Sequence, residues 1–209
     1  MNLVVLSGGI DSTSALSLAV ETGDPVTAIT FDYGQRHSKE IDSAHAVADY
    51  YQIPLTVIPL PNLLSGSALT FDSEVPKSAY DAESMADTVV PGRNLLFASL
   101  AVAQARQGDR VHLGVHGGDH ELYPDCRPEF WDRLTALAKD AYGVEIVTPF
   151  LHSSKSEVVA SATRLGAPLH LTWSCYEGGD DPCRECGTCV EREQAFRGAG
   201  AVDPLLEDS

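Results

Sequence analysis

The chain opens with NLVVLSGGIDS (residues 2–12), an apolar run followed at once by a polar loop that contains two glycines. Residues 2–6 have the pattern of a short buried strand, and residues 13–21 are rich in Ala and Leu, as in a helix. The free N–H groups and the dipole of a helix N-terminus attract anions, and glycines let the backbone come close to them. The segment therefore predicts a phosphate-binding loop between a strand and a helix.

This loop is not a Walker A motif, which would end in Gly-Lys-Ser or Gly-Lys-Thr. No lysine precedes Lys39, and Asp11 stands where a lysine would be expected. An aspartate there indicates phosphate held together with Mg²⁺, with pyrophosphate as the leaving group. The alternative is an ordinary strand–helix turn, because Ser, Gly and Asp are also favoured turn and cap residues.

Size and charge limit the class of protein. A chain of 209 residues suits one α/β domain with a sizeable core. Lys and Arg number 14 against 30 Asp and Glu, a formal net charge of −16, which argues against direct nucleic-acid binding. No apolar run is long enough to span a membrane, and the first is too short for a signal peptide. We therefore expect a cytoplasmic protein with no membrane partner.

Strand and helix patterns alternate along the rest of the chain. Further strands are predicted at residues 26–31, 55–58, 111–115 and 145–148, and helices at 37–51, 93–107, 128–142 and 154–165. The alternation predicts an α/β fold with a doubly wound parallel sheet. Ligands of such sheets bind at the carboxyl ends of the strands, which here carry residues 7–12, 32–37 and 116–119. The long polar segment 62–92 has the length of a functional or mobile loop.

Four of the five cysteines fall in one short window, at Cys175, Cys183, Cys186 and Cys189. Compact spacing in a cytoplasmic chain favours a metal over disulfides. Four thiolates match a closed tetrahedral Zn²⁺ site, and the alternatives are an iron–sulfur cluster and a redox or disulfide role. Cys126 stands apart, and we expect it to be a small, partly buried side chain.

Several stretches together resemble one family. Residues 7–12 resemble the loop of the N-type ATP pyrophosphatases, the superfamily of GMP synthetase and NAD synthetase. Within it, the chain resembles the 7-cyano-7-deazaguanine synthase family in FDYGQRH (31–37), VPGRN (90–94), YPDCRPEF (123–130), and SCY (174–176) with the later cysteines. The loop alone indicates only the superfamily, whereas the Tyr-Pro-Asp-Cys-Arg stretch and the cysteine set are far more particular. The match extends to about Phe196.

The resemblance implies a fold, a reaction and partners. It implies an adenine nucleotide alpha hydrolase-like ATP pyrophosphatase domain over residues 1–170 and a zinc-binding, C-terminal helical segment over residues 171–209. The implied enzyme is a carbon–nitrogen ligase of queuosine or archaeosine biosynthesis. It would convert 7-carboxy-7-deazaguanine and ammonia into the nitrile through adenylated and amide intermediates, using ATP and Mg²⁺ and releasing AMP and pyrophosphate. Zn²⁺ at the four cysteines and a homodimer are also implied.

The resemblance also implies roles for single residues. The predicted ATP-binding residues are Ser7, Gly8, Gly9, Asp11, Ser12 and Phe31. The predicted catalytic residues are Asp11, Arg93 and Lys155, with Lys155 on the polyphosphate and Ser154 in place of the threonine that often precedes this lysine. The predicted substrate-binding residues are Arg36, His37, Arg93, Asn94, Asp119, Tyr123, Asp125 and Arg127. The chemical reason for this set is that the edge of a guanine-like ring offers hydrogen-bond donors to carboxylates, and that a carboxylate on the substrate pairs well with an arginine.

Each role has a plain structural alternative, and the function has rivals. Lys155 and Arg93 would otherwise be surface residues, and residues 119–127 a solvated loop. A related enzyme that passes an adenylated deazaguanine to a macromolecule would need an added binding surface, and none is visible in the sequence. A tRNA-modifying pyrophosphatase would need a basic surface, which the net charge of −16 discourages. A non-catalytic nucleotide-binding module would need neither Lys155 nor the full cysteine set.

Overall fold

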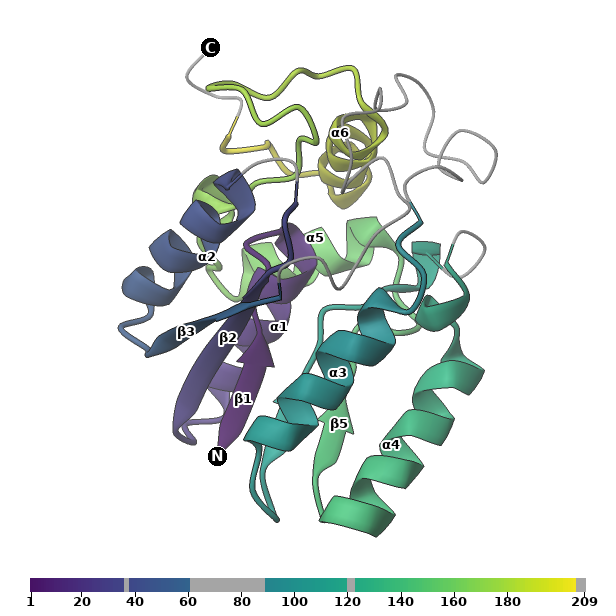
Figure 1. The fold of residues 1–209 in the computed structure, drawn as a ribbon. Helices are drawn as coiled ribbons and strands as arrows, with labels where there is room; N and C mark the ends of the chain where they lie inside the picture. Colours follow the sequence, from purple (N-terminus) through teal and green to yellow (C-terminus); the bar gives the residue numbers. More distant parts are fainter. Residues whose placement is uncertain (36–37, 61–88, 120–122, 206–209) are drawn as a thin grey trace.

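The computed structural model describes residues 1–35, 38–60, 89–119 and 123–205. Over these residues one five-stranded parallel sheet has the order β3-β2-β1-β4-β5 (Figure 1). Its strands are β1 (Asn2–Val5), β2 (Val26–Asp32), β3 (Leu55–Pro59), β4 (Arg110–His112) and β5 (Glu145–Val147). The predicted doubly wound parallel sheet is confirmed. Arg36, His37 and residues 62–88 of the predicted loop lie outside the described residues.

Helices cover both faces of this sheet (Figure 1). The helices are α1 (Ile10–Glu21), α2 (Lys39–Tyr50), α3 (Arg93–Gln104), α4 (Pro128–Tyr142), α5 (Lys155–Arg164) and α6 (Gly187–Ala199). In β1, Val4 points into the cluster formed with α1 and α2, whereas Leu3 and Val5 point to the cluster on α3 and α4. This alternation follows from the two-residue period of a strand. α5 packs on α1, and α6 packs on α5 above the carboxyl ends of the strands.

The start of α5 is fixed by a capping box. The Ser154 hydroxyl accepts a hydrogen bond from the Glu157 backbone N–H, and the Glu157 carboxylate accepts one from the Ser154 N–H at 2.7 Å. Reciprocal caps of this kind satisfy N–H groups that a helix end otherwise leaves unpaired. Ser154 is therefore the N-cap, and Lys155 is the first residue of the helix, one residue after the predicted start at residue 154.

The fourth strand is shorter than predicted. The apolar pattern predicted a strand over residues 111–115, but β4 ends at His112. The Leu113 N–H still bonds the Val147 carbonyl at 3.0 Å, and then the chain passes directly over the start of α1. A Cβ at Gly114 would lie 2.5 Å from the backbone nitrogen of Ser12, closer than packing allows. Contact with α1, which the local sequence does not encode, therefore ends the strand and brings residues 113–119 beside the glycine loop.

His112 makes the stability of the sheet depend on pH. Its side chain is buried, its Nε2 lies 3.1 Å from Asn2 Oδ1, and its Nδ1 has no partner among the described residues. Burial, with a contribution from Arg110, lowers the pKa of His112 from 6.5 to about 4. Between these values the unfolded chain binds a proton that the folded chain does not. Stability is therefore expected to fall as the pH falls from 6.5 to about 4, by up to about 3 kcal/mol.

Urea unfolding between pH 7 and pH 4 measures this dependence, with His112→Gln as the comparison. Gln cannot take up a proton, so the variant is expected to lose less stability than the wild type over the same range. Equal losses in the two proteins would show that other groups cause the acid sensitivity.

Among the described helices, none is long and apolar enough to cross a membrane.

Candidate functional site

The loop between β1 and α1 leaves a helix N-terminus without a side-chain cap. Gly9 is the N-cap of α1, and no side chain forms a capping hydrogen bond at this helix end. The Ser7 N–H donates to the Ser12 hydroxyl at 3.1 Å, and the two hydroxyls lie 3.0 Å apart. Gly8 has a φ of +84°, and a Cβ there would lie 2.3 Å from the Glu40 carbonyl oxygen. The first N–H groups of α1 can therefore receive an anion, as the sequence predicted, and Gly8 also lets α2 approach.

Lys155 lies directly over this loop. Its Nζ is 2.7 Å from Asp11 Oδ2 and 3.3 Å from Glu191 Oε2, and its side chain is only 17% exposed. Burial alone would lower the pKa of Lys155, but the attraction of these carboxylates raises it above its ordinary value. Burial opposes ionisation of Asp11 as well, and the Lys155 charge outweighs it, so the pKa of Asp11 is lowered. Lys155 is thus a buried cation of the cavity and not a surface lysine.

Glu191, which the sequence analysis missed, and His116, which lies at the predicted strand end 116–119 but received no role there, join Asp119 beside Lys155. His116 Nε2 lies 3.4 Å from Asp119 Oδ2 and 3.6 Å from Glu191 Oε1. His116 is 1% exposed, and its Nδ1 accepts the Gly118 N–H at 3.1 Å. Burial raises the pKa of Glu191. The strand-end position of residue 116 was a usable signal, but nothing in the sequence connects Glu191 with this cluster.

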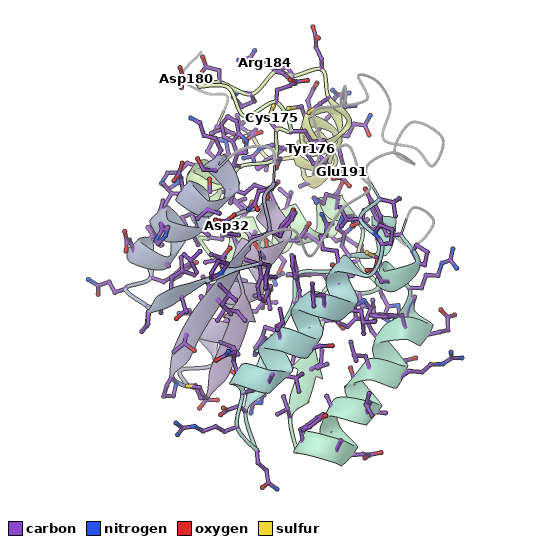
Figure 2. All side chains as sticks on the ribbon, in the orientation of Figure 1. Asp32, Cys175, Tyr176, Asp180, Arg184 and Glu191 are labelled. Atoms are coloured by element: carbon purple, nitrogen blue, oxygen red, sulfur yellow. The ribbon has the colours of Figure 1, made fainter. Side chains whose placement is uncertain are left out.

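These side chains line one end of a cavity of about 230 Å³ at the carboxyl edge of the sheet. Glu191 and Tyr176, labelled in Figure 2, reach it from the C-terminal segment above the strands. Phe31 stacks on Phe97 at 4.3 Å between ring centres and forms an aromatic wall. The predicted residues that line the cavity are Ser7, Gly9, Asp11, Ser12, Phe31, Arg93, Asn94, Asp119, Tyr123 and Lys155. Two of the predicted substrate-binding residues, Arg36 and His37, lie outside the described residues.

Asp125 and Arg127 do not line this cavity. The Asp125 carboxylate accepts the Asn94 backbone N–H at 3.0 Å, so it caps the first turn of α3. Arg127 is exposed and lines a separate depression on α4 with Phe130 and Leu134. The sequence grouped these residues because they are neighbours in one motif. The short helix at Pro124–Cys126 turns their side chains to different sides. A direct substrate role for Asp125 or Arg127 therefore has no support in this geometry.

The four clustered cysteines form a second site. Their Sγ atoms all lie within 4.8 Å of one another, and the five cysteines are all free of disulfides. Cys175 Sγ accepts the Cys183 N–H at 3.3 Å, and Cys183 Sγ accepts the Cys186 N–H at 3.3 Å. Backbone donors aimed at sulfur stabilise thiolates, which are the form that binds metal. This arrangement fits a closed four-thiolate metal site.

Cys126 does not belong to that site. It is buried beside the cavity, where its sulfur lies 3.3 Å from Asn94 Nδ2, which donates to it. Burial, reinforced by Asp119 and Asp125, raises the pKa of the Cys126 thiol. A neutral thiol is a poor nucleophile and a poor metal ligand. The expectation of a small buried side chain agrees with this placement.

A buried ion pair ties the cysteine segment to the body of the protein. Arg192 on α6 donates to both carboxylate oxygens of Asp203, at 2.7 and 2.8 Å. It also donates to the Thr172 hydroxyl at 2.9 Å and to the Leu169 carbonyl at 3.2 Å. Both charged side chains are almost fully buried. This planar fork fixes α6, and with it Glu191, above the cavity.

Replacement of Arg192 by Lys is expected to destabilise the protein by about 2 kcal/mol, because one ammonium cannot satisfy the partners of a guanidinium fork. Chemical unfolding measures the change. Arg197→Lys is the matched control. Arg197 is exposed and, among the described residues, forms an ion pair only with Glu193, one helical turn away, so the change should alter stability by less than about 0.5 kcal/mol. Equal effects of the two substitutions would contradict the role of the buried fork.

The sheet order and the position of the cavity together define the structural class of this protein. A parallel sheet of order 3-2-1-4-5 with its cavity beside adjacent β1 and β4 is that of a doubly wound α/β protein that binds a ligand at its topological switch point. The chain belongs to the family described as queuosine biosynthesis protein QueC, whose model matches residues 1–200. The family expected from the sequence motifs is thereby confirmed.

Individual relatives agree over nearly the whole length. A 7-cyano-7-deazaguanine synthase of Brucella anthropi is 46% identical, over 98% of this chain and 92% of the relative. One of Marinomonas sp. is 43% identical, over 97% of this chain and 96% of the relative. Among solved structures, the U34-tRNA thiolase NcsA from Methanococcus maripaludis, with its [4Fe-4S] cluster, matches with a TM-score of 0.50 and 15% identity, over 94% of this chain and 64% of that one. That likeness supports the fold alone.

Proposed function

We propose that the protein is a 7-cyano-7-deazaguanine synthase that uses ATP and ammonia to convert 7-carboxy-7-deazaguanine into the nitrile. The relatives of that name support the product. The observation that supports the ATP-dependent mechanism is the cavity itself, which the glycine loop, Lys155, Arg93 and the aromatic wall line together. Such a lining would suit both a polyphosphate and a planar anion.

The reaction requires two activations of one carbon. A carboxylate oxygen attacks the α-phosphorus of ATP, pyrophosphate leaves, and ammonia then displaces AMP to give the amide. A second ATP adenylates the amide oxygen, and loss of AMP with the nitrogen-bound protons leaves the nitrile. The α1 N-terminus and Lys155 would hold the departing pyrophosphate. Mg²⁺ beside Asp11, whose buried Oδ1 has no partner among the described residues, would neutralise polyphosphate charge.

The four cysteines are proposed to hold one Zn²⁺, with a structural role because four thiolates leave no coordination position open. An iron–sulfur cluster is the alternative that elemental analysis excludes or confirms. We further propose a division near residue 170 between the ATP pyrophosphatase-type domain and the zinc-binding segment, a homodimer, and a cytoplasmic location. Light scattering of the purified protein tests the dimer.

Incubation of purified protein with ATP, Mg²⁺, ammonium and 7-carboxy-7-deazaguanine, followed by mass spectrometry, tests the function. The expected products are the nitrile, AMP and pyrophosphate, with the amide as an intermediate. ADP and inorganic phosphate in stoichiometric amounts would contradict departure of pyrophosphate. Consumption of the base without a nitrile, and its appearance on a macromolecule, would favour the related enzyme that modifies a macromolecule.

A further inference from the structure

The cavity is also lined by a half-buried cation, Arg93, at the first residue of α3. Within residues 1–35, 38–60, 89–119 and 123–205, no carboxylate forms an ion pair with it. Burial alone would lower the pKa of Arg93, but the surrounding tyrosines Tyr33, Tyr176 and Tyr123, with Glu40, raise it above its ordinary value. Among the described residues its nearest direct partner is the hydroxyl of Tyr33, which carries no full negative charge. A buried cation without an anionic partner is costly unless a ligand supplies one. Arg93 is therefore placed to receive an anion.

Glu40, in the first turn of α2, faces the same space. Glu40 lines the cavity, its backbone carbonyl lies against Gly8 of the phosphate loop, and its carboxylate is close enough to Arg93 to interact with its charge. No described side chain forms a hydrogen bond or an ion pair with this carboxylate. Burial raises the pKa of Glu40, and the nearby Arg93 charge opposes that rise. A carboxylate in this position gains most from a ligand that brings N–H donors.

The walls between these two charged groups are aromatic. Phe97 stacks on Phe31, and Tyr33 lies against Phe97 with 5.5 Å between ring centres. Tyr176 and Tyr123 also line the cavity, near Arg93. Aromatic walls favour a flat ring. The space therefore suits a planar molecule with an anionic group at one point and N–H donors at another.

We infer that Arg93 binds the carboxylate of the substrate and that Glu40 binds the donor edge of its guanine-like ring. This inference rests on the proposed function, because it assigns the two polar ends of 7-carboxy-7-deazaguanine to two residues. It moves both contacts away from Asp125 and Arg127, the residues that the sequence motif suggested. Glu40 is then a specificity-determining residue that follows the motif ending at residue 37.

Calorimetric binding of three bases tests the assignment without any turnover. The bases are 7-carboxy-7-deazaguanine, 7-deazaguanine, which lacks the carboxylate, and 7-carboxy-7-deazahypoxanthine, which lacks the 2-amino group. Arg93→Gln is expected to weaken the carboxylated guanine about 10–100-fold and 7-deazaguanine less than about threefold, since a charge-assisted pair is removed only where the carboxylate exists. Arg106→Gln, an exposed arginine near the end of α3, is the control.

Glu40→Gln is expected to show the complementary pattern. It should weaken both guanine-type bases about 10–100-fold and the hypoxanthine-type base clearly less, because the latter has already lost a donor. Asp42→Asn, an exposed carboxylate on the same helix, is the control. Affinity for ATP should stay within about threefold in every variant, which separates a lost contact from a damaged fold.

Three outcomes would overturn the inference. Equal losses for all three bases in either variant would indicate a structural role. Unchanged binding would remove the residue from the site, and a selective loss in Arg127→Gln would return the carboxylate contact to the position the motif suggested. Failure of the proposed function gives a different result, because the wild-type protein would then not bind 7-carboxy-7-deazaguanine at all or would bind it without forming a nitrile.

Discussion

Lys155→Ala is expected to lower the turnover of nitrile synthesis about 10²–10³-fold, the usual cost of removing one group that stabilises charge developing in a transition state. The Lys155 ammonium lies 2.7 Å from Asp11, at the edge of the α1 N-terminus where pyrophosphate would leave. It is held there by Glu191 from a different helix. In the proposed mechanism its positive charge would therefore lie where negative charge develops.

Release of AMP and pyrophosphate by the variant, at saturating ATP, measures this effect. Asp11→Ala should act in the same direction, because it removes the partner of Lys155 and the proposed Mg²⁺ contact. Lys139→Ala, an exposed lysine on α4, should leave the rate unchanged. Turnover of Lys155→Ala and Asp11→Ala close to that of the wild type would show that the phosphates bind elsewhere.

Cys186→Ala is expected to remove the bound metal and to leave much of the protein insoluble or unfolded. The side chain is fully buried and lies within the four-sulfur cluster. Structural zinc sites contribute about 10–16 kcal/mol of apparent binding free energy, and this energy is also folding energy. Loss of the site would release the segment between Trp173 and α6. It would thereby also disturb Glu191 and Tyr176, which line the cavity from this part of the chain.

Elemental analysis and thermal unfolding of the purified protein measure both consequences. The wild type should contain one zinc per chain, and Cys126→Ala should contain the same amount, because Cys126 lies beside the cavity and not in the cluster. Iron with a visible cluster absorbance, or a zinc content that depends on Cys126, would contradict the assignment. Full stability of Cys186→Ala without metal would contradict a structural role.

Local pattern was sufficient for most of the secondary structure. The predicted helix at 128–142 coincides with α4, and the predicted strands at 2–6 and 26–31 match β1 and β2 to within one residue. Hydrophobic period and cap residues act over a few neighbouring positions, so a single sequence reports them. The end of β4 was predicted wrongly because Gly114 packs against the backbone at the start of α1, which is far away in the chain.

The residues of the candidate site also fall into two groups, those recognisable from a local motif and those brought together only by the fold. The sequence by itself determined the family, the glycine loop, Lys155 and the four cysteines, because each belongs to a compact motif whose chemistry can be recognised from residue type and spacing. Only the tertiary structure decided that His116 and Glu191 meet Lys155, that Asp125 caps α3, and that Arg93 and Glu40 are neighbours in the lining of one cavity. These contacts join helices and loops that are distant in the chain, and parallel strands bring such segments to one edge only after the sheet has formed.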